Sequence, residues 1–370
     1  MKLAIVAGIV VANDAISTAV INQATSALEM AGITEVTIFA QVISRELPCK
    51  GFVIGDAWTL TKHHDFDAAD IVIYHWGIYY DLFNAITLRQ KSSAIHFHNC
   101  TPLELVAPAD RSNAEQSIVQ INHAVALAIP VWNYSEFNRQ TLIGWGVSEH
   151  TISYVPFAFD VPSFVPTRLA PRGNMPVDRI EVLTVGRRSP AKGIHVLIAA
   201  VGLLQPATRA LLRVRIAGST QFFDEAYTLS LAAMIDEFRL HSTIEFVDDP
   251  TSDELEMLYQ SSDIFVSASL HEGLCMPVIE AYSAGCRVIG TTAGNLPFVV
   301  QQPDRCVVPD DPAALAAALE ATISEVRAVA GLRNDRSNSA VQFSRPSASW
   351  ALELAIAALT PDLPGGIDAP

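Results

Sequence analysis

The chain has 370 residues, 50% of them hydrophobic, and a formal net charge of −15. This length exceeds what one hydrophobic core usually organises, so we expect two domains, and the apolar content excludes a disordered chain. The negative charge repels phosphate backbones and anionic lipids, so we do not expect nucleic acid as a partner, and an anionic ligand would need a local positive site.

The cysteines and the apolar runs bear on the cellular compartment. The cysteines are odd in number, widely spaced and without the pairing typical of zinc sites: Cys49, Cys100, Cys275, Cys286 and Cys306. The start of the chain reads as a strand and a turn rather than a signal peptide, and the longest apolar run, residues 124–131, is far shorter than the roughly 20 residues of a spanning helix. We therefore expect a soluble protein of the reducing cytoplasm.

The first half of the chain alternates strand-like runs with segments of helical period. Runs rich in Val and Ile cover residues 2–9, 35–40, 70–75, 93–98 and 130–135, and helical segments cover residues 16–31 and 113–127. This alternation predicts a parallel sheet and a Rossmann-like domain over residues 1–160. Five prolines between Pro156 and Pro176 then predict a linker over residues 161–177.

A second alternation follows the linker and predicts another Rossmann-like domain over residues 178–345. Strands are expected at 180–186, 212–218, 243–247, 263–269, 286–291 and 306–309. Helices are expected at 193–204 and 225–239, behind a capping box of Thr251 and Glu254, after Pro277 and after Pro312. The predicted fold class is therefore α/β, with two parallel sheets. A last helix, about 346–360, would carry Trp350, Leu354 and Ala358 on one apolar face.

The stretch from His271 to Cys286 predicts an anion site beside two carboxylates. Pro277 suits the first position of a helix, so the amides of Leu274, Cys275 and Met276 would lie in the bend at its positive end, where backbone N–H groups can hold a diphosphate. Glu280, expected in the first helical turn, can accept hydrogen bonds from a diol such as a ribose, and Glu272 lies where strand ends meet ligands. The alternative is that Glu280 only caps the helix dipole and Glu272 is a solvated loop acid.

A basic turn near residue 190 strengthens the anion interpretation. Arg187, Arg188 and Lys192 lie within six residues directly after a predicted strand. In an acidic chain they form a local trap for a diphosphate, with Arg187 as a planar fork and Lys192 as a point charge. A solvated basic turn is the alternative.

Together these stretches resemble the donor-binding signature of family 4 glycosyltransferases, which have the GT-B fold of two Rossmann-like domains facing across a cleft. The resemblance rests on residues 185–193 and 267–300. It implies that Arg187 and Lys192 bind the donor diphosphate together with the amides of Leu274, Cys275 and Met276. It further implies that Glu280 binds the ribose, while Glu272, a catalytic candidate, and Gly273 lie near the transferred sugar.

The resemblance also implies a retaining transfer from a UDP- or GDP-linked sugar, with the nucleotide sugar as co-substrate and no other cofactor. Arg187, Lys192 and the helix end after Met276 would already stabilise the charge on the leaving diphosphate, so we expect no metal. Two positions depart from the family pattern. Cys275 replaces a usual Gly, which requires an unusual backbone conformation, and the later loop has Asn295 and Phe298 in place of a Gly and a Glu.

In the first domain, His98, Asn99, Thr101 and Pro102 resemble the His-Asn-x-Thr-Pro version of the family's acceptor domain. That resemblance makes His98 a catalytic candidate that faces the donor sugar. Further cleft candidates are Asn99 and, in loops at other strand ends, Asn13, Asp14 and His75. The alternative is that these are satisfied core or loop residues, which is how we interpret His63, His64 and His96.

The acceptor is not determined by the sequence: a saccharide, a glycolipid and a small molecule are all left open, as is peripheral contact with a membrane. Two other functions also remain. One is a nucleotide-sugar epimerase of the same fold, and the other is a catalytically silent protein that binds sugar nucleotides.

Overall fold

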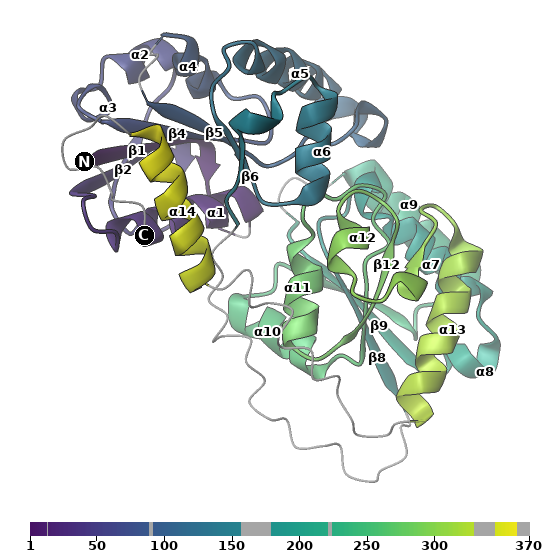
Figure 1. The fold of residues 1–370 in the computed structure, drawn as a ribbon. Helices are drawn as coiled ribbons and strands as arrows, with labels where there is room; N and C mark the ends of the chain where they lie inside the picture. Colours follow the sequence, from purple (N-terminus) through teal and green to yellow (C-terminus); the bar gives the residue numbers. More distant parts are fainter. Residues whose placement is uncertain (13, 89–91, 157–178, 221–223, 329–344, 361–370) are drawn as a thin grey trace. The chain divides into compact units, whose positions relative to one another are not determined.

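The computed structural model describes residues 1–12, 14–88, 92–156, 179–220, 224–328 and 345–360. The predicted linker, residues 161–177, and Asn13 lie outside these ranges. The chain divides into two compact units (Figure 1). The first comprises Met1–Leu103, Ala109–Asp160 and Gln342–Pro370, and the second comprises Glu104–Pro108 and Val161–Val341.

The first unit is built on a seven-stranded parallel sheet of order β3-β2-β1-β4-β5-β6-β7. Its strands are β1 (Lys2–Val10), β2 (Glu35–Ile43), β3 (Lys50–Val53), β4 (Ile71–Trp76), β5 (Ser93–Phe97), β6 (Val131–Asn133) and β7 (Ile152–Tyr154). Its helices are α1 (Ala15–Leu28), α2 (Ala57–Thr61), α3 (His64–Asp67), α4 (Ala85–Leu88), α5 (Arg111–Val125), α6 (Glu136–Gly144) and α14 (Arg345–Leu359), with the 3₁₀ turn η1 (Asp81–Asn84) before α4. The strand order reverses between β1 and β4, which creates a switch point where ligands bind in open α/β sheets.

The two faces of the first sheet carry separate cores because side chains alternate along each strand. On one face Ile5 and Ile73 pack with α1 and α14, and on the other Tyr74 and Trp76 pack with α2, η1 and α5. Figure 1 shows α14 beside α1, and Ser349 donates a hydrogen bond to Ser26 across that contact (Oγ to Oγ 3.1 Å). The C-terminal helix therefore covers part of the N-terminal sheet.

The predicted apolar face of α14 is wrong. Trp350 is 57% exposed, whereas Leu352, Ala355 and Ile356 are buried in the core beneath α1. The buried face of α14 carries Ala348 and Ala355, and α1 offers Ala24 and Ala27, so the two helices can approach closely. Close packing was thus favoured over burial of the largest side chain.

The second unit is built on a six-stranded parallel sheet of order β10-β9-β8-β11-β12-β13. Its strands are β8 (Ile180–Val185), β9 (Leu212–Gly218), β10 (Ile244–Asp248), β11 (Ile264–Val266), β12 (Arg287–Thr291) and β13 (Cys306–Val307). Its helices are α7 (Ile194–Leu203), α8 (Pro206–Arg209), α9 (Glu225–Phe238), α10 (Ser252–Ser261), α11 (Met276–Ser283), α12 (Leu296–Val299) and α13 (Pro312–Ala328), with the 3₁₀ turn η6 (Pro190–Lys192) before α7. Here the order reverses between β8 and β11.

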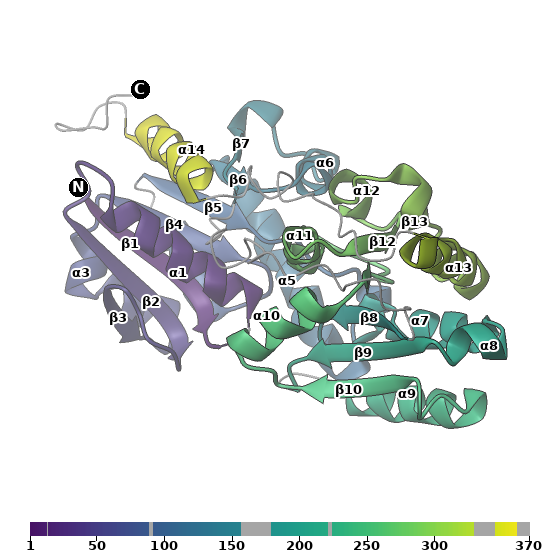
Figure 2. The same ribbon diagram turned by 90° about the horizontal axis from the view of Figure 1, so that it is seen from below.

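The helices of the second unit cover both faces of its sheet. Helices α7, α9 and α13 pack in one core, and α10, α11 and α12 pack in the other (Figure 2). The capping box of α10 is confirmed, because the Glu254 amide donates to Thr251 Oγ1 and the Thr251 amide donates to the Glu254 carboxylate. The predicted α/β class with two parallel sheets is confirmed.

Two further expectations concern the cysteines and membrane-spanning helices. All five cysteines are free thiols. In the described part of the chain, no helix has the length and apolar character needed to cross a membrane.

The anchoring of α14 can be tested by truncating its buried face. Replacing Ile356, which is fully buried, by Ala should lower the free energy of unfolding by about 2–5 kcal/mol because it leaves a cavity between α14 and the sheet. Replacing the exposed Trp350 by Ala should cost less than about 1 kcal/mol. Urea unfolding followed by circular dichroism measures both, and equal losses would contradict the observed packing of α14.

Candidate functional site

The loops that follow β8 and β11 meet at the switch point of the second sheet. Gly193 ends η6 in the left-handed conformation (φ 60°), and a Cβ there would lie 1.9 Å from the carbonyl oxygen of Ala268. No residue with a side chain fits this contact without moving the backbone. Because the two loops touch here, Lys192 is brought to the loop that carries Glu272.

Lys192 and Glu272 form an ion pair at this contact. The Lys192 Nζ lies 2.7 Å from Glu272 Oε1, and Ser269 Oγ donates to the same oxygen at 2.7 Å. The Glu272 side chain is only 9% exposed, so the alternative of a solvated loop acid is wrong. A charge this buried is stabilised by its partner and by the hydroxyl.

The neighbouring arginines separate into two environments. Arg188 is largely buried, stacks on the Phe246 ring at 4.4 Å and pairs with the Asp248 carboxylate, so it joins β8 to β10. Arg187 is exposed and forms no ion pair with the residues that the structure describes. Of the two, only Arg187 presents its guanidinium to an incoming anion.

The bend before α11 has the conformation that the departure from the family pattern required. Cys275 is left-handed (φ 65°, ψ 66°) directly before the helix, and its side chain is buried among apolar residues. Left-handed backbone costs a residue with a Cβ roughly 1–2 kcal/mol, which burial of the thiol offsets in part. In the described part of the chain, the amides of Gly273, Leu274, Cys275 and Met276 donate to no other residue. At the helix N-terminus these amides suit an anion.

Glu280 lies one residue farther into its helix than predicted. Because α11 already begins at Met276, Glu280 falls in its second turn, and both the first-turn placement and the alternative of a dipole cap are wrong. The hydroxyl of the fully buried Tyr259 donates to Glu280 Oε2 at 2.6 Å. Burial raises the pKa of Glu280, and the Tyr259 hydrogen bond opposes that shift. The carboxylate is therefore fixed in place by one oxygen.

The loop that carries Asn295 and Phe298, the other departures from the family pattern, contacts the backbone of the site. The Asn295 amide donates to the Glu272 carbonyl at 2.9 Å, and its side-chain Nδ2 donates to the Leu274 carbonyl at 3.3 Å. Gly294 is left-handed, and a Cβ on it would lie 2.2 Å from the Glu272 carbonyl oxygen. Phe298, where the family has Glu, is 54% exposed on α12. Asn295 thus has a structural role in this chain.

In the first unit, Asp14 and Asn99 shape the backbone at strand ends. Asp14 caps α1, with Oδ2 accepting from the Ser17 amide and hydroxyl at 2.7 Å each. Asn99 is left-handed (φ 79°), its Oδ1 accepts from the Cys100 amide at 2.6 Å, and its Nδ2 donates to Asn138 Oδ1 at 2.6 Å.

His75 and His98 bond each other, and they belong to a cluster with Gln23 and His96, two residues that the sequence analysis did not include in the site. His75 Nδ1 lies 2.8 Å from His98 Nε2, His75 Nε2 lies 2.7 Å from Gln23 Oε1, and Gln23 Nε2 lies 3.1 Å from His96 Nδ1. We call Gln23, His75, His96 and His98 the histidine ladder. The i, i+2 spacing of His96 and His98 was the available signal, since it puts both on one face of a strand. Burial lowers the pKa of all three histidines, that of His96 to about 3.

The three histidines also raise the question of a metal. Their nearest ring nitrogens lie within 4.8 Å of one another. However, the His75 and His98 rings lie edge to edge, because their centroids are 5.0 Å apart while His75 Nδ1 and His98 Nε2 are only 2.8 Å apart. The lone pair and the N–H of an imidazole lie in the ring plane, so these two nitrogens point at each other and bond each other instead of one ion. The geometry favours a hydrogen-bonded chain over a metal centre.

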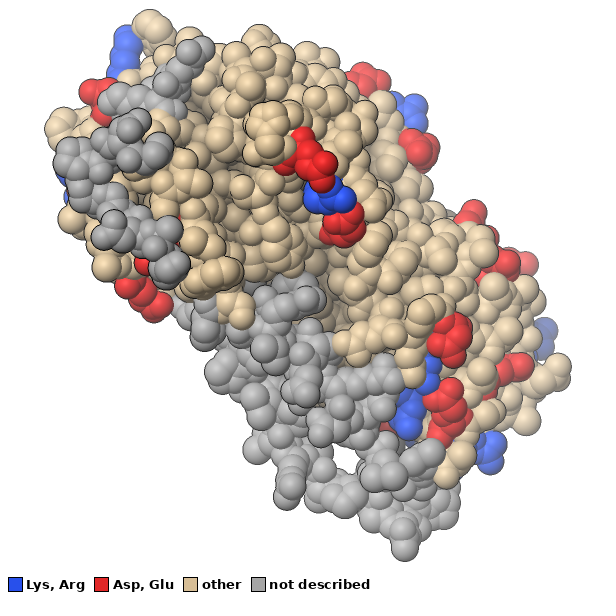
Figure 3. Space-filling model, viewed as in Figure 1, with Lys and Arg blue, Asp and Glu red and all other residues tan. Residues whose placement is uncertain are grey.

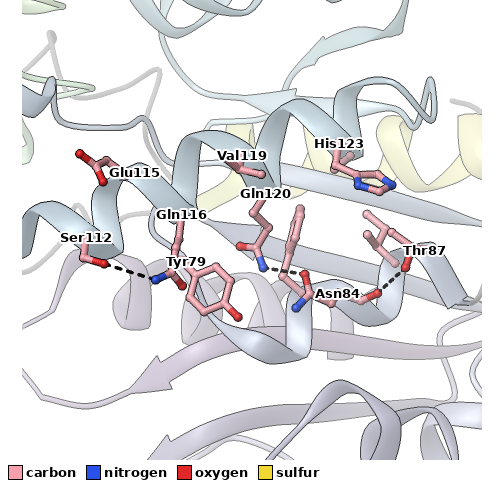
Figure 4. A pocket seen from close by; sticks show the side chains of 12 residues that line it. Tyr79, Asn84, Thr87, Ser112, Glu115, Gln116, Val119, Gln120 and His123 are labelled. Carbon is pink, nitrogen blue, oxygen red and sulfur yellow. Dashed lines mark hydrogen bonds between the residues drawn. The ribbon is translucent and has the colours of Figure 1, made fainter.

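A separate groove of about 490 Å³ lies between α5 and the η1–α4 segment (Figure 4). The Gln120 side chain forms its polar floor, donating from Nε2 to Asn84 Oδ1 at 2.9 Å, while Phe83 and Val119 supply apolar walls. None of the predicted site residues lines this groove, so it is distinct from the candidate site.

Comparison with known proteins bears on the family and the fold of the chain. Residues 168–340 match the family described as glycosyl transferases group 1. The second unit is a group 1 glycosyltransferase domain. The D-inositol 3-phosphate glycosyltransferase of Corynebacterium efficiens is 29% identical over 198 residues, which are 52% of this chain and 46% of that protein. The chain therefore matches slightly less than half of that relative.

Other similar proteins extend over more of the chain. The O-antigen chain mannosyltransferase B of Escherichia coli is 24% identical over 282 residues, which are 70% of this chain and 66% of that protein. Two solved structures share the fold: sucrose-phosphate synthase from Thermosynechococcus elongatus (TM-score 0.78, 20% identity, 98% of this chain, 100% of that chain) and Anabaena HepE in complex with UDP and glucose (TM-score 0.75, 16% identity, 97% and 100%). The chain accordingly has the GT-B fold of glycosyltransferases.

The strained bend generates one prediction. Replacing Cys275 by Gly should leave the free energy of unfolding within about 1 kcal/mol of the wild type, because relief of the left-handed conformation offsets the lost thiol packing. Replacing it by Val should cost more than about 2 kcal/mol, since a β-branched residue is disfavoured at positive φ. Urea unfolding compares the two, and a Val variant as stable as the Gly variant would argue against a left-handed residue here.

A second prediction concerns pH. Because burial raises the pKa of Glu280, the folded state binds its proton more tightly than the unfolded state, so the contribution of this group to stability falls as pH rises above the ordinary glutamate pKa. Glu280→Gln should therefore be more stable than the wild type at pH 7, and the difference should vanish below about pH 4. Urea unfolding at several pH values tests this, with the exposed Glu237→Gln as a control expected to show no such trend.

Proposed function

We propose that this protein transfers a sugar from a nucleoside diphosphate sugar to an acceptor hydroxyl, with retention of the anomeric configuration, in polysaccharide or glycoconjugate biosynthesis. The proposal is carried by one observation: Lys192, Glu272 and the bend at Cys275 converge at the carboxyl ends of β8 and β11. This is the switch point of a group 1 glycosyltransferase domain.

The donor roles follow from the chemistry of the leaving group. As the glycosyl–phosphate bond breaks, negative charge gathers on the diphosphate, and fixed donors at that position lower the barrier. We assign this role to Arg187 and Lys192, together with the amides of Leu274, Cys275 and Met276. Glu280, whose carboxylate Tyr259 orients, would accept from the ribose hydroxyls.

The Lys192–Glu272 pair suggests an exchange of partners on donor binding. In the ligand-free protein the Glu272 carboxylate neutralises Lys192, as a phosphate oxygen would. An arriving diphosphate would take over the ammonium and release the carboxylate toward the transferred sugar, beside Gly273. Glu272 would then act on the sugar only when the donor is bound. Exclusion of water from that complex would limit hydrolysis of the donor.

The first unit would supply the remaining groups. Following the family resemblance, we propose that His98 assists at the transferred sugar. The residues that would shape its surroundings are His75, Asn99, Asp14 and Asn13. The assignment to the His-Asn-x-Thr-Pro subgroup and the cytoplasmic location also stay predictions. UDP is the first donor nucleotide to test because the HepE structure contains it.

The acceptor is proposed to be a saccharide or a small molecule rather than a membrane lipid. On the face shown in Figure 3, the Lys and Arg side chains of the described residues lie beside Asp and Glu rather than in a basic patch. Among the described residues, Arg139 pairs with both Glu136 and Glu149. Attraction to an anionic membrane surface would require clustered positive charge.

A catalytically silent sugar-nucleotide binder is the second candidate. It is favoured by Phe298, an exposed phenyl ring where the family carries a carboxylate. Binding of a nucleotide sugar without turnover for any acceptor would support it.

Ligand binding tests the proposal. In calorimetric titrations with UDP-, GDP-, ADP- and dTDP-linked sugars, at least one donor should bind, and Lys192→Gln should weaken that binding by about 10–100-fold because a charge-assisted hydrogen bond is lost. Glu272→Gln should bind the free nucleoside diphosphate more tightly than the wild type does, because Lys192 no longer has an internal partner, yet it should lose turnover.

The matched control is Lys50→Gln. Lys50 also pairs with a glutamate, Glu35, at 2.6 Å, but on the surface of the first unit. Its loss should leave nucleotide affinity unchanged. Failure of every nucleotide sugar to bind, or equal losses in the Lys50 and Lys192 variants, would refute the proposed donor site.

A further inference from the structure

The histidine ladder lies on one face of the first sheet. His75 is in β4, His96 is in β5 and His98 follows β5, and the parallel register places His75 beside His96. The helix α1 covers this face and supplies Gln23. All four side chains are at most 9% exposed, and Ala348 and Leu352 of α14 line the same small cavity as Gln23 and His96.

We propose that Gln23 is a positioning residue that fixes the proton on each imidazole of the ladder, and thereby determines which nitrogen of His98 is protonated. The functional part of this inference rests on the role proposed above for His98. The structural part, the positions of the protons, does not depend on it.

The argument starts from the two ends of the Gln23 amide, since Oε1 can only accept and Nε2 can only donate. Oε1 faces His75 Nε2 at 2.7 Å, so that nitrogen carries a hydrogen and donates. Nε2 faces His96 Nδ1 at 3.1 Å, so that nitrogen is unprotonated and accepts. One amide thus imposes opposite roles on the two histidines that it joins.

The rest of the chain follows from neutrality. Burial lowers the pKa of His75, His96 and His98, so each ring carries a single N–H at neutral pH. With its hydrogen on Nε2, His75 has an unprotonated Nδ1, which lies 2.8 Å from His98 Nε2 and accepts its hydrogen. His98 is then left with an unprotonated Nδ1.

This arrangement gives His98 a defined polarity. Its Nδ1 can accept a hydrogen bond or a proton but cannot donate one. If the Gln23 amide turned over, His75 would carry its hydrogen on Nδ1 and His98 would carry its own on Nδ1 as well. Gln23 therefore acts on His98 through His75, without contacting it.

The experiment uses the full chain with ¹⁵N-labelled histidine and reads the tautomers of His75, His96 and His98 from long-range ¹H–¹⁵N correlation spectra. In the wild type, hydrogens are expected on Nε2 of all three rings. In Gln23→Leu, which can neither accept nor donate, the signals of His75 and His98 should shift toward a mixture of tautomers. In Gln23→Glu, which keeps an acceptor facing His75, those two rings should keep their hydrogens on Nε2.

Gln120→Leu is the matched control. Gln120 is equally buried in the same unit and bonds Trp76 and Asn84 from the opposite face of the sheet, so its loss costs comparable hydrogen bonds without touching the ladder. Both leucine variants should be destabilised, and only Gln23→Leu should change the histidine spectra.

Once a donor and an acceptor are known, Gln23→Leu should lower kcat about tenfold, which corresponds to a rise of about 1.4 kcal/mol in the activation free energy. The KM for the donor should stay unchanged.

Three outcomes would overturn the inference: hydrogens on Nδ1 of His75 or His98 in the wild type, wild-type tautomers in Gln23→Leu, or stoichiometric Zn²⁺ binding that shifts all three histidines. The outcome is separable from that of the proposed function. The tautomers are read without substrate, and nucleotide binding depends on residues of the second unit.

Discussion

The close approach of Gly193 to the carbonyl of Ala268 is the constraint on which the donor site depends. At 1.9 Å from that oxygen there is no room for a Cβ, so only glycine allows the loop after β8 to rest on the end of β11. Gly294 makes a similar contact with the Glu272 backbone from the other side. Held between these two contacts, Glu272 meets Lys192 in a fixed position, and a carboxylate that would be costly to bury alone becomes stable.

The two units handle buried polar groups in opposite ways. In the second unit charge is kept and compensated: Lys192 pairs with Glu272, and Arg188 pairs with Asp248 while stacking on Phe246. In the first unit charge is suppressed, because burial lowers the pKa of the three histidines and leaves neutral rings linked by Gln23. The first arrangement suits an anionic leaving group, and the second suits directional hydrogen bonding. The Lys192–Glu272 pair lies at a reversal of strand order, where side chains from separate loops can converge.

Local patterns carried the prediction of the fold. The alternation of Val- and Ile-rich runs with helical periods placed the strands, and the capping box placed the start of α10. The position of Pro277 predicted the start of α11 to within one residue, because proline acts on the backbone directly. Where the prediction failed, a competing interaction in space was responsible: α14 buries Leu352 and Ile356 instead of Trp350 because the small residues of α1 allow close packing there.

By itself, then, the sequence determined the two parallel sheets, the family resemblance of the second unit and the set of candidate site residues, since each depends on residues near one another in the chain. Only the tertiary structure decided which of them meet. The Lys192–Glu272 pair joins residues 80 positions apart, and Gln23 lies 52 and 73 positions from the histidines that it links. Such contacts depend on strand order and on helix packing, which are properties of the whole fold and leave no local pattern in the sequence.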